Sequence, residues 1–280
     1  MPEREPQRFS STPLTAGLRI ALRVEYDGTP FSGWQAQPHL ANVRTVQQSL
    51  EAALTAVAAT PVVVHCAGRT DTGVHATAQW VHFDAPAARS MKAWVVGTNA
   101  QLPAQVRVVD GGVVPDDFHA RHSAESRRYD YLIANTAVAP ALMDRRALWV
   151  REPLDAERMH AAMQALLGER DFSAFRAAAC QSRTPMRCMT EASAVRAGAW
   201  IRIRVEANAF LHHMVRNIVG SALAVGGGER GRDWLAELLA GRDRTVAAPT
   251  APAHGLYLTG VRYPPHYGLA APATPAFFPA

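Results

Sequence analysis

The chain contains little cysteine, and its three cysteines are widely spaced. Cys66, Cys180 and Cys188 are odd in number and lack close pairing, which argues against a disulfide framework. No two of them have the spacing of a zinc knuckle, and no His-Glu-x-x-His pattern is present. The sequence therefore predicts neither a disulfide scaffold nor a metal site.

Long apolar runs are also missing. No run approaches the roughly 20 residues that a membrane-spanning helix needs. Residues 1–17 are polar, contain proline and have no signal-peptide core, so we expect a flexible N-terminal segment. The sequence also lacks a P-loop and the glycine fingerprint of nucleotide-binding folds. We therefore expect a soluble, cytoplasmic protein that uses no cofactor and does not contact a membrane.

Lysine is almost absent. Of the 29 basic residues only Lys92 is a lysine. Arginine pairs with phosphates in a bidentate manner and stacks on bases, although the codon bias of a GC-rich genome explains the excess equally well. Residues 1–120 carry 9 basic and 10 acidic side chains, whereas residues 121–262 carry 20 and 14. The basic second half permits a polyanionic partner.

The predicted elements follow the order strand, helix, strand, strand, helix, strand, and the second half repeats this order. Alternating or β-branched runs predict strands, and apolar spacing of three to four predicts helices. In the first half the strands are 18–26, 61–64, 78–83 and 106–114, and the helices begin at Thr45, with a Thr45–Gln48 capping box, and at Ser90. In the second half the strands are 125–134, 189–195, 200–206 and 256–263, and the helices are 155–167, 210–225 and 234–239.

This order is that of the split βαβ arrangement. We therefore expect an α+β protein with two ferredoxin-like halves related by pseudo-symmetry, whose antiparallel sheets form a central cleft. The expected halves are residues 18–120 and 121–263. The Pro/Ala-rich tail 264–280 is expected to be weakly ordered, although Phe277 and Phe278 could dock on the body. Residues 171–188 lack periodicity, and we expect a mobile loop there.

The stretch from Cys66 to Ala76 forms a tight loop between two predicted strands. Gly68 and Gly73 bracket it, and glycine adopts turn geometries that other residues resist. The loop presents Asp71 beside Arg69 on a rigid support, as is common for binding and catalytic groups. On the residues alone, an aspartate that caps a turn and a solvated arginine are the more common outcome.

Two stretches of the second half carry further candidates. Tyr129 and Tyr131 share one face of a strand, where they could fill the core or, if exposed, stack on a base; the pattern alone favours the core. On the predicted helix 210–225, His212 and His213 would point about 100° apart, which is poor geometry for one metal ion. Arg216 on the same helix would by itself be a surface charge.

Several of these stretches resemble one family. Residues 68–75 read Gly-Arg-Thr-Asp-Thr-Gly-Val-His and resemble the signature of the TruA family of tRNA pseudouridine synthases, with Thr72 where alanine is common. Arg-Tyr-Asp-Tyr at 128–131 and Phe-Leu-His-His-Met-Val-Arg-Asn at 210–217 resemble it too. Further matching stretches are Tyr26–Gly28, Gly33–Gln35, Pro115–Arg121, Asp155–Met159, Cys180–Pro185 and Gly255–Leu258.

The resemblance implies the activity and the roles of site residues. It implies isomerisation of uridine to pseudouridine at positions 38, 39 and 40 in the anticodon arm of tRNA, by a homodimer. Asp71 would be the nucleophile, and Tyr129 would stack on the target base. Arg216 would pair with Asp71. Apart from the resemblance, the position of Arg69, two residues before Asp71, places it to fill the space left by the flipped base or to hold phosphate. Removal of water favours a protonated carboxylate, and a guanidinium that stays charged opposes this.

Other interpretations remain open at this point. The chain could be an RNA-binding module without catalysis, since ferredoxin-like sheets with aromatic residues often bind RNA. It could also be a metal-dependent hydrolase that uses Asp71, His75 and His65. In the loop 27–35, Phe31 and Trp34 cover the core or contact RNA, and the sequence does not choose between these roles.

Overall fold

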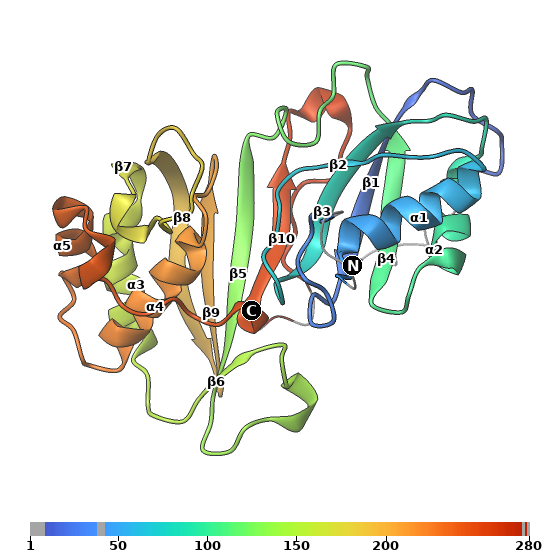
Figure 1. Cartoon of the computed structure of the whole chain (residues 1–280). Coiled ribbons are helices and arrows are strands. Elements are labelled where there is room, and N and C mark those ends of the chain that lie inside the picture. The colour runs from blue at the N-terminus through green and yellow to red at the C-terminus, as the bar shows by residue number, and fades with distance from the viewer. Residues whose placement is uncertain (1–8, 38–42, 276–277, 279–280) are drawn as a thin grey trace, which may run out of the picture. The chain divides into compact units, whose positions relative to one another are not determined.

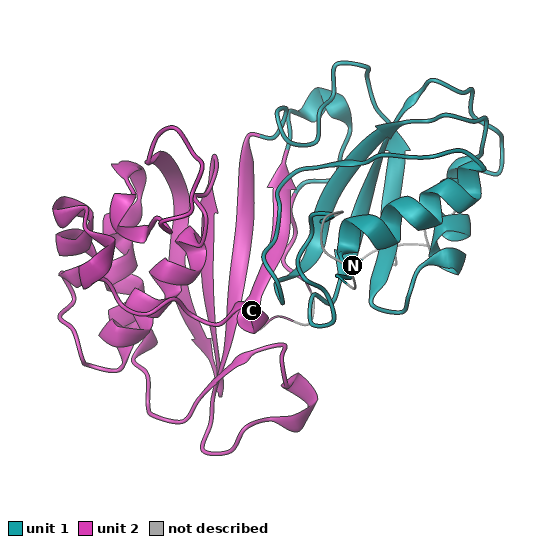
Figure 2. Cartoon of the chain, in the orientation of Figure 1, with its two compact units in different colours: residues 1–124, 263–271 teal, residues 125–262, 272–280 magenta. Residues whose placement is uncertain are grey.

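The chain divides into two compact units (Figure 2). The computed structural model describes residues 9–37, 43–275 and 278. Unit 1 comprises residues 1–124 and 263–271, and unit 2 comprises residues 125–262 and 272–280. The C-terminal tail is thus shared, because residues 263–271 belong to unit 1 and the rest of the tail belongs to unit 2.

Unit 1 is built on an antiparallel sheet (Figure 1). Its strands lie in the order β4 (Val106–Val113), β1 (Arg19–Tyr26), β3 (His75–Asp84) and β2 (His65–Cys66). The predicted apolar face of β1 is confirmed, because Ile20, Leu22 and Val24 are fully buried.

The predicted strand at residues 61–64 is wrong. The backbone N–H of Val62 donates to Thr55 Oγ1 at 3.1 Å, and that of Val64 donates to Glu51 Oε1 at 3.0 Å. Side chains of a helix therefore take up the donors that a strand would have used. Pairing with β3 begins only at His65.

The helix that supplies these side chains is α1 (Val46–Ala58), which crosses one face of the unit 1 strands (Figure 1). The predicted capping box is confirmed: Thr45 Oγ1 accepts from the N–H of Gln48, and Gln48 Oε1 accepts from the N–H of Thr45. The helix predicted from Ser90 is a π-helical turn, Ala93–Gly97, that continues into α2 (Thr98–Gln101).

Unit 2 repeats the strand order of unit 1. Its strands lie in the order β10 (Leu256–Arg262), β5 (Ser126–Asn135), β9 (Trp200–Ala207), β8 (Met186–Ala197) and β7 (Gly168–Asp171), all antiparallel. The short β6 (Leu148–Val150) pairs with β5 in parallel. If the strands of each unit are numbered along the chain without β6 and β7, both units follow the order 4-1-3-2. The molecule is therefore an α+β protein with open, mostly antiparallel sheets.

The helices of unit 2 are α3 (Ala156–Met163), α4 (Met214–Gly226) and α5 (Trp234–Gly241). Asp155 caps α3, as predicted, by accepting from the N–H of Arg158 at 2.9 Å. The prediction that a helix begins at Phe210 is wrong, because α4 begins only at Met214.

The late start of α4 has a local cause. The N–H of His212 donates to Cys180 Sγ at 3.4 Å, and its carbonyl accepts from the N–H of Ala177 at 3.1 Å. His213 has a φ of 60°, in the left-handed region. Residues 210–213 are thus tied to the 177–180 loop and are not helical.

Two arginines organise the long segment between β7 and β8. Arg176 donates to the carbonyls of Cys180 and Ser182, each at 2.8 Å. Arg187, which is 7% exposed, donates to the carbonyl of Thr184 at 3.0 Å and to Ser182 Oγ at 2.7 Å. Guanidinium groups satisfy several carbonyls at once, and here they replace a regular ladder.

Aromatic side chains fix the tail. In unit 1, Tyr263 donates to the carbonyl of Ala120 at 2.7 Å, and its ring lies 5.0 Å from that of Phe118. In unit 2, Phe278 is buried against Tyr257 and other apolar residues, as the docking alternative expected. Phe277 lies outside the described residues. Within those residues, no helix combines the length and apolar character needed to cross a membrane.

A cluster of imidazole rings lies at the end of unit 1 where β2, β3 and residues 118–122 meet. The His82 ring centroid lies 5.1 Å from that of His65 and 4.6 Å from that of His119, which lies 4.3 Å from His122. His82 Nδ1 accepts from the N–H of Ala120 at 3.2 Å. Burial, and then the neighbouring His119 and His65, lower the pKa of His82 from 6.5 to about 4.

The cluster predicts that unit 1 loses stability in mild acid. The unfolded chain takes up a proton at His82 near pH 6.5, whereas the folded chain does so only near pH 4, so stability falls as the pH falls through this window. We expect a loss of about 2 kcal/mol from His82 between pH 7 and pH 5, measured by urea unfolding with tryptophan fluorescence.

The matched control is His82→Asn, because an amide oxygen can still accept from the Ala120 N–H but does not titrate. Between pH 7 and pH 5, the unfolding free energy of this variant should fall by about 2 kcal/mol less than that of the unchanged protein. An equal acid loss in this variant and in the unchanged protein would contradict the assignment.

Candidate active site

The loop that carries Asp71 is held from the strand that follows it. The side chain of Gln79, on β3, is fully buried, accepts from the N–H of Gly68 at 3.4 Å and donates to its carbonyl at 2.5 Å. The N–H of Ala67 donates to the carbonyl of Trp80 at 2.8 Å. The backbone that enters the loop is therefore fixed at consecutive residues.

A second loop braces the same segment from the side. The N–H of Trp34 donates to the carbonyl of Thr70 at 3.0 Å, and the Tyr26 hydroxyl is 2.8 Å from Thr70 Oγ1. Gly33 has a φ of 87°, and a Cβ there would lie 2.9 Å from the Thr70 carbonyl oxygen. Trp34 is 2% exposed, so of the two roles considered for the 27–35 loop, the core role describes its aromatic residues.

Asp71 itself closes a turn. Its carbonyl accepts from the N–H of Val74 at 3.1 Å, and Gly73 takes the left-handed conformation with a φ of 78°. Its side chain is half-buried, whereas that of Arg69 is exposed. The structure thus places both predicted residues on one braced loop of unit 1, with the carboxylate two residues beyond the guanidinium.

His75 supports the 27–35 loop. Its Nδ1 accepts from the N–H of Gly28 at 3.0 Å and lies 3.2 Å from Asp27 Oδ1, and the side chain is 2% exposed. His65 lies in the imidazole cluster described above. These contacts give no support to a hydrolase that uses His75 and His65 with Asp71.

The second candidate set lies in unit 2. Tyr129 and Tyr131 are on β5, where Tyr129 pairs with Val205 of β9. Tyr131 is fully buried, and its hydroxyl donates to the carbonyl of Pro252 at 2.8 Å, so it fills the core. Tyr129 is 9% exposed, and its ring lies edge-on to that of Phe210 with centroids 5.1 Å apart.

Arg216 lies in the first turn of α4 and is half-buried. Its Nε donates to the carbonyl of Ala251 at 2.8 Å. Because the guanidinium is planar, this bond sets the direction of its terminal nitrogens. Asp71 and Arg216 belong to different units, so their expected ion pair stays a prediction.

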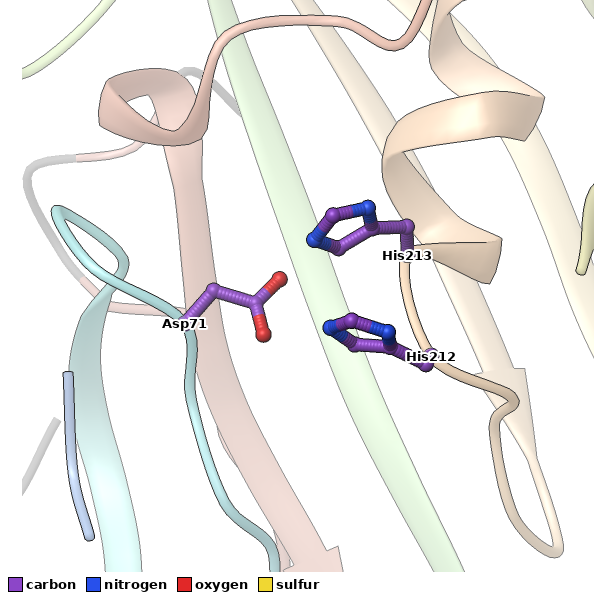
Figure 3. A group of neighbouring side chains, drawn as sticks. All are labelled: Asp71, His212 and His213. Atoms are coloured by element: carbon purple, nitrogen blue, oxygen red, sulfur yellow. The ribbon is translucent and has the colours of Figure 1, made fainter. Parts of the chain in front are cut away.

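The two histidines before α4 lie on the segment that leads into the helix (Figure 3). Their rings are 4.0 Å apart, so the expectation that they diverge on a helix is wrong. Figure 3 also draws Asp71, which belongs to unit 1. Among the described residues, neither unit alone contains three histidine, cysteine or carboxylate side chains close enough to share a metal ion.

Internal ion pairs involve several arginines of unit 2. Asp130 is fully buried and accepts from Arg204 Nε at 2.7 Å, and Glu206 accepts from Arg128 at 2.7 Å. Burial acts to raise the pKa of Glu206, but hydrogen bonds from Ser126 and Arg128 outweigh it and lower that pKa. These arginines are part of the fold, but each pair also uses an acidic side chain, so the excess of basic over acidic side chains in residues 121–262 is unchanged.

The cysteines differ in their electrostatics. Burial raises the pKa of the Cys66 thiol to about 11, which keeps it neutral beside the loop that carries Asp71. Burial also acts to raise the pKa of Cys180, but hydrogen bonds from the backbone of His212 and Ser182 outweigh it and lower that pKa.

Sequence reasoning missed the residues that hold the site. Gln79 lies in an alternating run that predicts a strand. A polar amide at a buried position of this strand was the signal that could have identified it. Ala251 acts through its backbone carbonyl, and no side-chain pattern marks such a role. Asn217 lies within the 210–217 motif, which gives no sign that its amide contacts Phe175, Arg244 and Thr250.

Known proteins resemble this chain over most of its length. The family model described as tRNA pseudouridine synthase matches residues 22–123 and 162–264. The tRNA pseudouridine synthase A of Escherichia coli O9:H4 (strain HS) is 53% identical over 254 residues, which cover 91% of this chain and 93% of the relative. The protein of the same name from Shigella boydii serotype 18 gives the same values. The chain therefore belongs to the tRNA pseudouridine synthase family, and it is an isomerase of that family.

Proposed function

We propose that the protein converts uridine to pseudouridine at positions 38, 39 and 40 in the anticodon arm of tRNA, with Asp71 as the nucleophile. The observation that carries this proposal is the braced loop, which holds a half-buried carboxylate within the stretch that resembles the family signature. The matched relatives are named for action on tRNA, and this supports tRNA as the substrate.

The reaction rearranges one bond of the nucleoside. The N1–C1′ bond of uridine breaks, the uracil turns, and a C5–C1′ bond forms, so no atom is supplied from outside. The Asp71 carboxylate attacks C1′, as in retaining glycosidases, or removes the C2′ proton to give a glycal. In either route the proton on C5 then leaves, and Tyr129 or Asp71 accepts it.

The target base is stacked in the RNA and must be extruded to reach a carboxylate. Arg69 is exposed on the Asp71 loop, so its side chain can enter the vacated space or hold a phosphate. Tyr129 presents part of its ring to the base, braced edge-on by Phe210. Arg216 pairs with Asp71 and keeps the carboxylate ionised while RNA excludes water.

The two units act as ferredoxin-like halves related by pseudo-symmetry, with their sheets on either side of a cleft for RNA. The shared strand order 4-1-3-2 supports the relation between the two halves. The active form is a homodimer, as the resemblance implies.

The first test incubates the protein with unmodified tRNA transcripts and maps pseudouridine. We expect product at positions 38 to 40, and a fall of more than about a thousandfold in Asp71→Asn with folding and tRNA binding retained, because an amide is not a nucleophile. The matched control is Asp117→Asn, an exposed aspartate of unit 1. Absence of product with the unchanged protein would overturn the function, whereas normal yield in Asp71→Asn would overturn the nucleophile alone.

A second test concerns the hydroxyl of Tyr129. If this hydroxyl moves the C5 proton, Tyr129→Phe should keep tRNA affinity and slow single-turnover product formation by about tenfold to a thousandfold. Stacking on the base survives in the variant because the ring is kept. An unchanged rate would limit Tyr129 to stacking and leave Asp71 as the base.

The third test is the salt dependence of tRNA binding. Phosphate contacts release counterions, so the affinity of the inactive Asp71→Asn variant should fall at least about thirtyfold between roughly 50 and 200 mM salt. Filter binding or fluorescence anisotropy measures it. A flat response would show that the basic side chains of residues 121–262 do not contact phosphates.

A further inference from the structure

The segment 249–251 is bound to the first turns of α4. The N–H of Ala251 donates to the carbonyl of Arg216 at 3.1 Å, and its own carbonyl accepts from Arg216 Nε at 2.8 Å. A Cβ on Gly220 would lie 2.1 Å from the carbonyl oxygen of Pro249, so the segment passes directly over a bare helix backbone. The position of the Ala251 carbonyl therefore depends on how this segment is held.

A polar network holds the 249–251 segment through Thr250, the residue before Ala251. The Thr250 hydroxyl donates to Asn217 Oδ1 at 2.6 Å and accepts from Arg244 at 3.1 Å. Arg244 also donates to Asn217 Oδ1 at 3.1 Å. Asn217 is 1% exposed, and its Nδ2 donates to the carbonyl of Phe175 at 2.8 Å. Each side chain of the network contacts the other two, and a part-buried network of this kind rigidifies its surroundings.

We propose that Asn217, Arg244 and Thr250 are positioning residues for Arg216. The inference rests on the proposed function, in which Arg216 pairs with the catalytic carboxylate. The network fixes the 249–251 segment, the Ala251 carbonyl fixes the Nε of Arg216, and the plane of the guanidinium is set before substrate binds. An arginine side chain otherwise samples many rotamers, and preorganisation of this kind raises the rate of the chemical step.

The geometry separates this role from plain stabilisation. A residue that only stabilises unit 2 would change the unfolding temperature without altering the rate of the folded enzyme. A residue that sets the direction of a guanidinium used in the chemical step lowers kcat and leaves the KM for tRNA nearly unchanged.

The test uses Thr250→Val, which keeps the shape of the side chain and removes one hydroxyl. We expect kcat on an unmodified tRNA transcript to fall about fivefold to tenfold, with KM within about twofold, since both hydrogen bonds of the hydroxyl to the network are lost. Thr250→Ser keeps the hydroxyl and should restore kcat. The matched control is Ser221→Ala, which removes a buried hydroxyl that donates to the Asn217 carbonyl within α4 and should leave kcat within about twofold.

A double variant completes the test. In Arg216→Lys the ammonium has no Nε to bind Ala251, so adding Thr250→Val should lower single-turnover rates no further. If Arg216→Lys is impaired but Thr250→Val alone is normal, or if the two effects multiply, the positioning role is overturned. If Arg216→Lys itself has full activity, the role proposed for Arg216 fails first, and the positioning role fails with it.

Discussion

The amide of Gln79 is the contact on which the proposed catalytic loop most depends. It satisfies both backbone groups of Gly68 from a strand position that water does not reach. A buried amide that lost these partners would be left unsatisfied, at about 1–3 kcal/mol for each group. The loop and the strand therefore form one rigid body, and the carboxylate of Asp71 needs no strained backbone of its own to be held in place.

Unit 2 achieves the same end by a different chemical route. There the guanidinium of Arg216 is held at its Nε by the carbonyl of Ala251, and the network of Asn217, Arg244 and Thr250 holds the peptide that carries this carbonyl. In both units, backbone groups and polar side chains hold the segment that supports a charged group of the proposed reaction.

Local signals in the sequence were enough for most of the fold. The alternation in β1, the capping box at Thr45 and the capping aspartate at Asp155 each depend on residues a few positions apart, and each was predicted. The failures have another cause. The donors of Val62 are bound by the side chain of Thr55, and the backbone of His212 is bound by residues of the 177–180 loop. Tertiary structure determines which groups become partners of this kind, and no local sequence pattern predicts them.

The candidate site shows the same contrast between residues that a local pattern predicts and residues that tertiary structure brings in. The motif around Asp71 was visible because its residues are contiguous, whereas the supports at Gln79 and Ala251 are separate in sequence or act through the backbone.

The bare backbone of Gly28 also limits how this chain can change over evolutionary time. A Cβ at this position would lie 2.0 Å from the carbonyl oxygen of Val74, so the peptide after β1 and the peptide before β3 meet with no space for any side chain. A mutation that shifts the backbone of either peptide is therefore tolerated only if the other peptide still fits against it, although nearly fifty positions separate them in the printed sequence. Recombination that joined these two peptides from different ancestors would have to match their backbones to within a few tenths of an ångström, so we expect them to be inherited as a pair.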